Sequence, residues 1–358
     1  MALPKIGFSI GDINGIGLEV ILKSLVRSNF SGYFIPVIFG SVKLINYHKK
    51  NLSIEDHLFY HLKEGEQPKP KKINIFTCWT DEATILPGEI NIEGGRFASL
   101  SLDAAFNSLQ TRYIDSVITA PIHKKSMELA GFGFPGHTEF FADKYPRHRS
   151  LMLMVYDDLR IGVVTGHIAL HDVAKNISRQ TIIDKANIFI QSLKIDFAIE
   201  RPVIAVLGLN PHAGDQGLFG DEEAKIIIPA INELKNAGHL VMGPYPADGF
   251  FGSGQFRKFD GILAMYHDQG LVPFKTLAFG GGVNFTAGLP IVRTSPDHGT
   301  AFDIAGKNLA DPASIRQATY LAIDIMRNRK EYYKLMSNKL TARKDKIEGE
   351  DEIIVDME

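Results

Sequence analysis

The sequence predicts an α/β protein with two lobes and a mixed, mostly parallel sheet. Short apolar segments alternate with amphipathic helical patterns along most of the chain, which is typical of strands joined by crossover helices. Several apolar segments have no polar alternation, as expected for parallel strands buried on both faces. The 358 residues exceed the roughly 250 at which one hydrophobic core stops growing, so we expect two lobes.

The first expected strand, Ile6 to Ile10, leads into a Gly-Asp turn and a helix over about Gly15 to Ser28. The other expected strands are Phe34 to Phe39, Ile73 to Thr77, Ser116 to Ala120, Leu151 to Val155, Ile161 to Thr165, Val203 to Leu207, Gly261 to Met265 and Leu289 to Arg293. Only Tyr156 to Leu159 separates the strands that begin at Leu151 and end at Thr165. This connection is too short for a crossover helix, so the pair should form an antiparallel hairpin.

Three later helices have recognisable ends. Ser178 can cap a helix that reaches about Leu193, and Gly238 can end a helix that begins near Glu222. Asp311 and Pro312 can start a helix that reaches about Leu335. The residues after that helix are rich in charges of both signs, and we expect a charged tail on which Ile353 to Val355 could dock.

Composition excludes several classes of protein. The 39 Lys plus Arg residues nearly balance the 41 Asp plus Glu residues, so a formal net charge of −2 gives no field that attracts nucleic acid or an anionic membrane. Cys78 is the only cysteine, which excludes an intramolecular disulfide and a paired-cysteine zinc site. The first residues lack a signal-peptide pattern, and no run of about 18 apolar residues occurs. We therefore expect a cytoplasmic protein with no nucleic-acid or membrane partner.

Histidine, glycine and acidic residues gather just after several expected strands, where open α/β sheets bind ligands. Three of these loops contribute His167, His212 and His267. Imidazole is a ready ligand for zinc, and three protein ligands with one open position is the catalytic pattern. The spacings of 45 and 55 residues are not those of a local metal motif, so hydrogen-bonded loop histidines remain the alternative. We expect His171 to lie on the surface.

The common nucleotide fingerprints are missing. Gly15-Ile16-Gly17 is followed by Val20 where a dinucleotide motif requires glycine, and Gly306-Lys307 lacks the spacing and hydroxyl residue of a P-loop. Gly11 and Asp12 precede a helix start, where backbone N–H groups could face an anion. A tight strand-to-helix turn without a ligand explains the same residues equally well.

Several long blocks, taken in order, resemble one enzyme family. They are GDINGIGLE at Gly11–Glu19, TAPIHK at Thr119–Lys124, GHTE at Gly136–Glu139, GHIAL at Gly166–Leu170, GLNPHAGDQGLFGDEE at Gly208–Glu223, GPYPAD at Gly243–Asp248, AMYHDQGLVPFK at Ala264–Lys275 and VNFTAGLPIVRTSPDHGTAFDIAGK at Val283–Lys307. As a set they resemble the 4-hydroxythreonine-4-phosphate dehydrogenases of pyridoxal 5′-phosphate biosynthesis. The last block also resembles the adenosine-side loop of isopropylmalate and isocitrate dehydrogenases, which bind NAD(P) without a Rossmann fingerprint.

This resemblance implies an isopropylmalate dehydrogenase-like fold of two lobes with mixed, mostly parallel sheets. Residues 1–135 and 290–340 would form the first lobe, on the cofactor side. Residues 136–289 would form the second lobe, which carries the metal and substrate site and the dimer contacts. Residues 341–358 would form the charged tail.

The resemblance also implies the residues of the site. His167, His212 and His267 would bind one divalent metal per subunit (zinc, magnesium or cobalt) at a site built across a homodimer interface. Substrate contacts would come from His137, Thr138, Lys275, Asn284 and Arg293, which suit a phosphate or carboxylate. Asp248 would lie near the metal and handle a proton. Cofactor contacts would come from Gly11, Asp12, Asp297, Gly299 and Asp303.

The implied reaction starts with oxidation of 4-phosphohydroxy-L-threonine at its C3 hydroxyl, with hydride passing to NAD or NADP. The resulting β-keto acid then loses carbon dioxide to give 3-amino-2-oxopropyl phosphate. A cation can assist both stages by stabilising negative charge on the substrate oxygen. The nicotinamide cofactor carries the redox chemistry, and the protein positions the substrate against it.

The sequence departs from the family pattern at five positions. Ile13 and Asn14 replace a proline-alanine pair, Leu18 replaces a proline, His123 stands where asparagine is usual, and Gly249 replaces a threonine. None of these removes a predicted metal ligand. Gly249 lies near the predicted substrate site and leaves the identity of the substrate open, although drift in loop packing also explains it.

Three other functions remain compatible with the sequence. A sibling dehydrogenase would act on a phosphorylated sugar acid such as threonate or erythronate phosphate. A metallohydrolase could use the same histidines and phosphate contacts. A non-catalytic metabolite-binding protein is the third alternative, against which the intact set of loop histidines argues.

Overall fold

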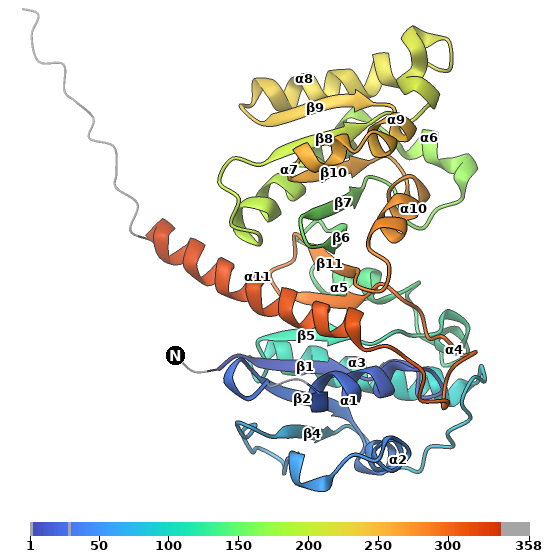
Figure 1. Cartoon of the computed structure of the whole chain (residues 1–358), viewed down its shortest axis with the longest axis vertical. Helices are drawn as coiled ribbons and strands as arrows, with labels where there is room; N and C mark the ends of the chain where they lie inside the picture. The colour runs from blue at the N-terminus through green and yellow to red at the C-terminus, as the bar shows by residue number, and fades with distance from the viewer. Residues whose placement is uncertain (1–2, 28–29, 338–358) are drawn as a thin grey trace, which may run out of the picture.

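The structure is a computed structural model that describes residues 3–27 and 30–337. All its strands belong to one twelve-stranded sheet with the order β3-β4-β2-β1-β5-β12-β11-β6-β7-β10-β8-β9. Helices cover both faces of the sheet along its length (Figure 1). The predicted α/β fold with a mixed, mostly parallel sheet is confirmed.

One end of the sheet, at the bottom of Figure 1, is parallel throughout. Its strands are β1 (Lys5–Ser9), β2 (Ile35–Gly40), β3 (Phe59–His61), β4 (Ile73–Thr77) and β5 (Ser116–Thr119). Its helices are α1 (Gly17–Arg27), α2 (Val42–Leu52), α3 (Ile92–Gln110) and α4 (Lys124–Leu129). Parallel pairing requires such crossovers, and it explains why β1, β2 and β5 are buried almost completely.

The other end is also parallel, from β7 to β9. Its strands are β7 (Leu159–Val163), β8 (Val203–Leu207), β9 (Leu240–Tyr245) and β10 (Gly261–Ala264). Its helices are α6 (Val173–Asn176), α7 (Arg179–Ile195), α8 (Ile228–Asn236), α9 (Ala247–Gly252) and α10 (His267–Leu277).

Antiparallel strands join the two ends. β6 (Leu151–Tyr156) pairs antiparallel with β7 and with β11 (Val283–Ala287), and β11 pairs antiparallel with β12 (Arg293–Pro296). β12 then pairs parallel with β5. The hairpin predicted from the short connection after Leu151–Val155 is therefore confirmed, and it lies in the middle of the sheet.

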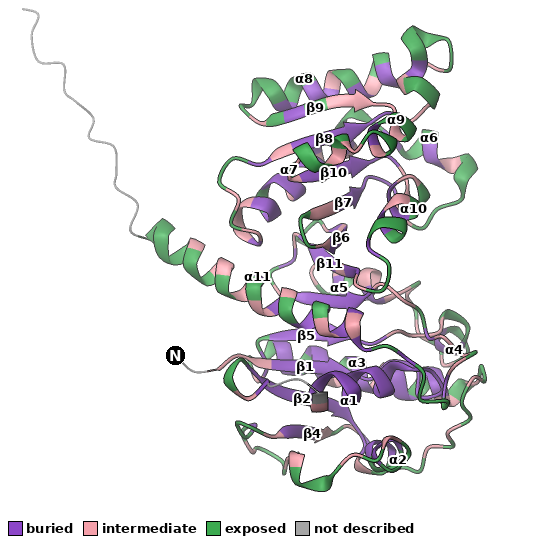
Figure 2. Ribbon diagram, viewed as in Figure 1, coloured by how far each residue is buried: buried purple, intermediate pink, exposed green. Residues whose placement is uncertain are grey.

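A single long helix, α11 (Ala313–Ser337), crosses the front of the sheet between the two ends (Figure 1). Ile315 and Ala318 lie in the hydrophobic core around β1 and α1. Ala322 and Ile325 lie in the core formed by β6, β8 and α7. Figure 2 shows the strands behind α11 as largely buried, whereas the side of α11 that faces the viewer is mostly exposed or intermediate. α11 thus packs against the cores of both ends.

Most predicted elements match the observed ones within two residues, but the strand predicted at Leu289–Arg293 is wrong. The observed strand β12 begins at Arg293, and the preceding residues form a loop. Leu289 and Val292 are apolar because they pack into two different cores from this loop. The short edge strand β3, the edge strand β9 and the central strand β11 were not predicted from the sequence.

The predicted helix ends are confirmed. Ser178 Oγ accepts a hydrogen bond from the N–H of Thr181, and Asp311 Oδ1 accepts one from the N–H of Ala313. Gly238 ends its helix with a φ of +85°. The helix expected from Glu222 differs in its first turn, which is π-helical over Glu223–Ile227 before α8 begins.

The lobe boundaries at residues 135–136 and 289–290 stay a prediction. The tail 341–358 and its segment Ile353 to Val355 lie outside the described residues. Within the described part of the chain, none of the helices has the length and apolar character needed to cross a bilayer.

Because α11 packs against both cores, truncating its buried side chains should destabilise the fold. We expect Ile325→Ala, at a fully buried position, to lower the free energy of unfolding by about 2–5 kcal/mol. Leu335→Ala in the same helix, where the side chain is 67% exposed, should change it by less than about 0.5 kcal/mol. Urea unfolding followed by circular dichroism measures both, and equal effects would contradict this role for α11.

Candidate active site

The three predicted metal ligands follow three neighbouring strands. His167 follows β7, His267 follows β10 and His212 follows β8, and these strands pair in the order β7-β10-β8. All three are parallel, so their carboxyl ends meet at one edge of the sheet. Topology therefore brings together loops that are 45 and 55 residues apart in the chain.

Two of these histidines lie against each other. The ring centroids of His167 and His267 are 5.2 Å apart. Two imidazoles bound to one tetrahedral zinc ion, with Zn–N bonds of about 2.0–2.1 Å, place their ring centroids about 5 Å apart. The observed separation therefore fits two ligands of a single cation.

Each histidine of the pair also has a carboxylate beside its Nδ1 atom. His267 Nδ1 is 2.6 Å from Asp268 Oδ1, and His167 Nδ1 is 3.6 Å from Glu139 Oε1. The adjacent ring of His167 lowers the pKa of Glu139. Metal-binding histidines usually donate the second ring N–H to a carboxylate, which fixes the tautomer and leaves the other nitrogen free. This arrangement leaves Nε2 of both rings available to a cation.

His212 stands on an unusual loop. Its backbone and that of Ala213, Asp215 and Gln216 have φ between +39° and +57°, the left-handed region that residues with a Cβ rarely adopt. The buried carboxylate of Glu223 holds the start of this loop, accepting hydrogen bonds from the N–H groups of Leu209 and Asn210 and from the Asn210 amide. The His212 side chain is exposed and lies near Phe219.

The described residues contain no group of three or more His, Cys, Asp or Glu side chains that could hold a metal ion. One chain thus places two of the predicted ligands together and leaves His212 outside that pair. The donor chemistry fits a zinc-type cation, with two imidazoles supplied by one chain and a third still required.

Arg293 occupies a buried position on the central sheet. It is 2% exposed, and among the described residues its guanidinium donates hydrogen bonds only to the hydroxyls of Thr119 and Thr286. Burial lowers the pKa of Arg293 to about 10. A buried cation without a bound carboxylate is costly unless an anion compensates it, so this position suits a substrate phosphate or carboxylate.

Two neighbouring polar atoms lack hydrogen-bond partners among the described residues: Nε2 of His137 and Oδ1 of Asn284. Burial and then the charge of Arg293 lower the pKa of His137 well below its usual value, so its ring is neutral. Asn284 lies two residues before Thr286 on β11, and the two side chains therefore point to the same face of the sheet. Thr138 follows His137 at the start of α5 (His137–Lys144). These atoms are available to a bound polar ligand.

The remaining predicted substrate and proton-handling residues are exposed. Lys275 lies in the last turn of α10, and Asp248 lies in the first turn of α9. Burial raises the pKa of Asp297, while a hydrogen bond from Ser314 and the positive charge of Lys275 oppose this shift. Lys275 therefore lies near the loop that carries the predicted cofactor residues.

The predicted cofactor residues come from two loops that contact each other. The N–H of Ile16 donates a hydrogen bond to the carbonyl oxygen of Thr300. Gly299 and Asp303 are exposed on the second loop. On the first loop Gly11 has a φ of +70° and a Cβ there would meet the Pro121 carbonyl at 2.2 Å, so only glycine fits.

Asp12 is buried beneath the same turn. Its Oδ1 accepts a hydrogen bond from the N–H of Asn14 and its Oδ2 has no partner among the described residues. Burial raises the pKa of Asp12. The carboxylate thus holds the turn from inside the protein and is not displayed to solvent.

The unusual residues of this chain are accommodated locally. Asn14 bonds to the 86–89 loop, where its side chain accepts from the N–H of Leu86 and donates to the Glu89 carbonyl. His123 caps α4 and stacks on Phe302 with ring centroids 4.9 Å apart. A Cβ at Gly249 would meet no atom within 4 Å, so this glycine is not required by packing.

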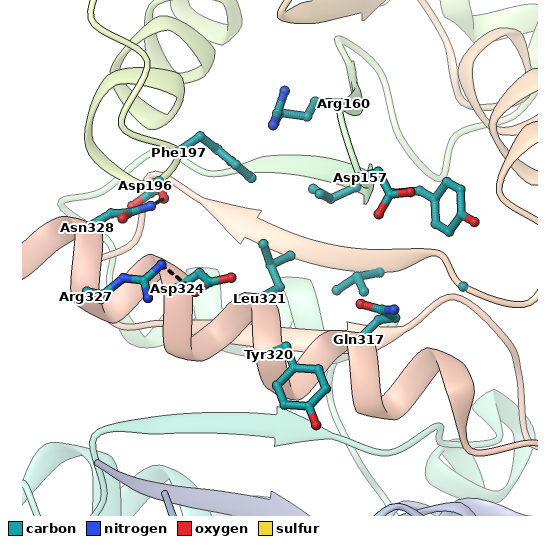
Figure 3. Close-up of a pocket in the computed structure, with 14 residues that line it drawn as sticks. Asp157, Arg160, Asp196, Phe197, Gln317, Tyr320, Leu321, Asp324, Arg327 and Asn328 are labelled. Atoms are coloured by element: carbon teal, nitrogen blue, oxygen red, sulfur yellow. Dashed lines mark hydrogen bonds and ion pairs between the residues drawn. The ribbon is translucent and has the colours of Figure 1, made fainter. Parts of the chain in front are cut away.

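A separate cavity of about 280 Å³ opens between the β6–β7 hairpin, the end of α7 and α11 (Figure 3). Val283 of β11 lines it, whereas Asn284 points to the opposite face of the strand. Figure 3 shows Arg327 paired with Asp324 on α11, with Arg160 on the facing wall. None of the predicted site residues lines this cavity, so it is distinct from the candidate active site.

Comparison with known proteins now identifies the family. Residues 33–322 match the family model of the pyridoxal phosphate biosynthetic protein PdxA. This chain belongs to the PdxA family. A 4-hydroxythreonine-4-phosphate dehydrogenase of Bacteroides thetaiotaomicron is 47% identical over 326 residues, which cover 91% of this chain and 89% of the relative.

Solved structures agree with this assignment. A crystal structure of 4-hydroxythreonine-4-phosphate dehydrogenase from Klebsiella pneumoniae has a TM-score of 0.76 and 33% identity and covers 90% of this chain and 99% of its own. An isocitrate dehydrogenase from Methylococcus capsulatus, with a TM-score of 0.50, 12% identity and coverage of 94% and 89%, shares the fold alone. The predicted family, its isocitrate dehydrogenase-like fold and its class, oxidoreductase, are confirmed.

The sequence analysis of this PdxA family member did not single out Glu139, Asp268, Thr119 or Thr286. Asp268 directly follows a predicted ligand in the sequence, and Glu139 ends the GHTE block. Carboxylates commonly orient metal-binding histidines, so both residues could have been predicted from the sequence. The two threonines carry no such signal, because only strand pairing places their hydroxyls against Arg293.

The buried carboxylate of Asp12 makes a pH-dependent prediction. The pKa of Asp12 is higher in the folded state than its usual value of 3.8. Ionisation of this carboxyl therefore opposes folding. We expect Asp12→Asn to raise the free energy of unfolding at pH 7. The gain should shrink as the pH falls and the native carboxyl becomes protonated.

Urea unfolding at several pH values measures the effect, and Asp303→Asn, at an exposed carboxylate in the neighbouring loop, is the matched control. A loss of stability at pH 7 in Asp12→Asn would show that the fold requires the charge.

Proposed function

We propose that this chain catalyses the NAD(P)-dependent, divalent-metal-dependent oxidation and decarboxylation of 4-phosphohydroxy-L-threonine to 3-amino-2-oxopropyl phosphate. The observation that carries the proposal is the contact of His167 with His267, in which each ring has a carboxylate beside Nδ1. Membership of the PdxA family supplies the reaction class. Relatives with the name 4-hydroxythreonine-4-phosphate dehydrogenase supply the substrate.

His167, His267 and His212 would hold the cation. When bound, it would withdraw electron density from the substrate's C3 oxygen, which favours loss of the hydroxyl proton and later stabilises the charge left as carbon dioxide departs. Glu139 and Asp268 keep the two paired imidazoles in the tautomer that exposes Nε2. The nicotinamide cofactor, when bound, would accept the hydride from C3.

Anchoring of the substrate falls to the buried polar groups. The permanent positive charge of Arg293 would pair with a substrate anion, and the neutral ring of His137 and the amide of Asn284 would complete its hydrogen bonds. Thr138 and Lys275 would contact the substrate from the start of α5 and the end of α10. An anchored anion fixes the distance from C3 to the cofactor, which is the main contribution a protein makes to such a reaction.

The cofactor would lie along the two touching loops that carry Gly11, Asp12, Asp297, Gly299 and Asp303. Asp12 would act indirectly by holding the turn, because its carboxylate is buried. Asp248 would handle a proton from the rim of the site, where it is exposed.

A homodimer with the active site at the interface would supply the missing third ligand. Exposed apolar side chains flank each histidine loop: Leu170 is 74% exposed, Leu218 is 72% exposed and Val272 is 62% exposed. A second copy that covered these side chains would also bring its own His212 within reach of the His167–His267 pair.

A sibling activity is the second candidate. A relative from Cutibacterium acnes with the provisional name D-threonate 4-phosphate dehydrogenase is 35% identical over 335 residues, which cover 90% of this chain and 94% of the relative. Gly249, where the family usually has threonine, leaves open space in the loop near the predicted site. The two substrates differ in the amino group at C2.

An assay of NADH formation tests the proposed function. We expect the purified protein, supplied with NAD⁺ or NADP⁺ and a divalent metal, to turn over 4-phosphohydroxy-L-threonine in preference to D-threonate 4-phosphate. His167→Ala and His267→Ala should each lower kcat/KM by about 100-fold or more, whereas His171→Ala, a surface histidine 77% exposed at its side chain, should not.

Preference for the sugar acid would establish the sibling activity. Phosphate release without NADH formation would indicate a metallohydrolase. Binding of the substrate without any turnover would indicate a non-catalytic binding protein.

The carboxylate beside His267 gives a separate prediction. Asp268→Asn should weaken zinc binding by about 10- to 100-fold, because the amide no longer orients the imidazole or raises its basicity. Competition with a chromophoric chelator measures the affinity directly. Asp172→Asn is the control, since Asp172 also directly follows a histidine and lies 3.2 Å from Nε2 of that surface residue, His171. An equal effect of both changes would rule out the specific role of Asp268.

A further inference from the structure

A groove lies on the molecule away from the candidate active site. Its volume is about 550 Å³, and its walls come from α7, the second half of α11, the loop before β6 and the loop between β11 and β12. None of the predicted catalytic, substrate, metal or cofactor residues lines it. The groove is therefore separate from the candidate active site.

Most of the groove's surface is apolar. Ile188 and Ile195 contribute from α7, Leu289 and Pro290 from the β11–β12 loop, and Tyr333 from α11. Tyr333 is 61% exposed, and Leu335 and Met336 beyond it are exposed as well. Figure 2 shows the last turns of α11 projecting from the body of the protein with little cover.

Basic side chains surround this apolar surface. Arg147, His148, Arg149 and Arg329 all line the groove. Arg149 is paired with Asp184, and Arg329 is paired with the buried Asp196. Arg147 is exposed and forms no ion pair with the described residues. The rim thus carries a cation that is free to pair with an acidic ligand.

The chain itself contains a segment of matching chemistry. Residues 348–358 read EGEDEIIVDME and contain six Asp or Glu residues, no Lys or Arg, and the apolar residues Ile353, Ile354, Val355 and Met357. We propose that this C-terminal segment docks in the groove, with its apolar residues against α7 and Tyr333 and its carboxylates facing Arg147 and His148.

The connection is long enough for this docking. α11 ends at Ser337, one helical turn after Tyr333, so the connecting residues 338–347 start beside the groove. Ten residues extend to at most about 35 Å and span on average about 17 Å when flexible. A short tether of this kind gives an effective concentration in the millimolar range, so even weak contacts would keep the groove occupied.

Site-directed spin labelling of the full chain tests the proposal. A nitroxide attached to the Val355→Cys variant reports on the acidic segment, and one attached to Ala342→Cys reports on the connecting residues. Burial raises the pKa of the native Cys78 to about 12, so this thiol stays protonated and reacts slowly with the label.

We expect the label at position 355 to be immobilised and the label at position 342 to remain mobile. Arg147→Glu should shift the docking equilibrium toward the mobile form by roughly two- to fivefold. Arg201→Glu, at an exposed arginine outside the groove, should leave the spectrum unchanged. Tyr333→Ser should also release the label, because it removes apolar contact at the end of the groove.

A mobile label at position 355 in the parent chain would overturn the proposal, as would an immobilised label that ignores both groove variants. To guard against damage by the label, hydrogen exchange of residues 187–196 is compared between the unlabelled parent and a Glu350→Gln, Asp351→Asn, Glu352→Gln variant. Faster exchange in the variant is expected. Immobilisation that is lost on dilution would assign the groove to the segment of a second copy and refute docking within one chain.

Discussion

The hydrogen bonding of β12, β11 and β6 in the middle of the sheet is the constraint on which the rest of the structure depends. These strands connect the two parallel ends without a break, so the loops of both ends emerge from one continuous framework. Buried backbone N–H and C=O groups must be hydrogen-bonded. The three strands β12, β11 and β6, which we call the seam, provide these partners, whereas two separate sheets would each have an open edge. α11 strengthens the connection from the front, because it packs into the cores of both ends.

The same seam creates the chemical contrast of the site. Side chains on β11 alternate between the apolar core beneath α11 and the opposite face, where Thr286 meets the guanidinium of Arg293. Hydroxyls from β5 and β11 accept three hydrogen bonds from the buried guanidinium of Arg293 without neutralising its charge. Its positive charge is thus kept for a ligand. The paired histidines are also left available to a ligand, since Nδ1 of each ring faces a carboxylate and Nε2 stays free.

The sequence predicts those features that depend on short-range patterns. Apolar runs located β4 and β8 at their observed bounds, and Ser178 and Asp311 located helix starts through their side-chain caps. Features that depend on long-range contacts were missed. Leu289 and Val292 pack as a loop between two cores, β9 pairs at an edge with alternating burial, and Thr119 contacts a residue 174 positions away. The family resemblance implied that His167 and His267 lie together, whereas their spacing in the sequence did not, because strand order brings their loops to one edge of the sheet.

The backbone around His212 costs stability, because several consecutive residues with a Cβ occupy the left-handed region. That region is narrow, and Glu223 anchors the loop from below. The narrow left-handed region and the hydrogen bonds to Glu223 together restrict the conformations that this segment can adopt. A cation that bound His212 would therefore bind a preorganised loop. Less conformational entropy would be lost on binding, and the affinity for the cation would be higher.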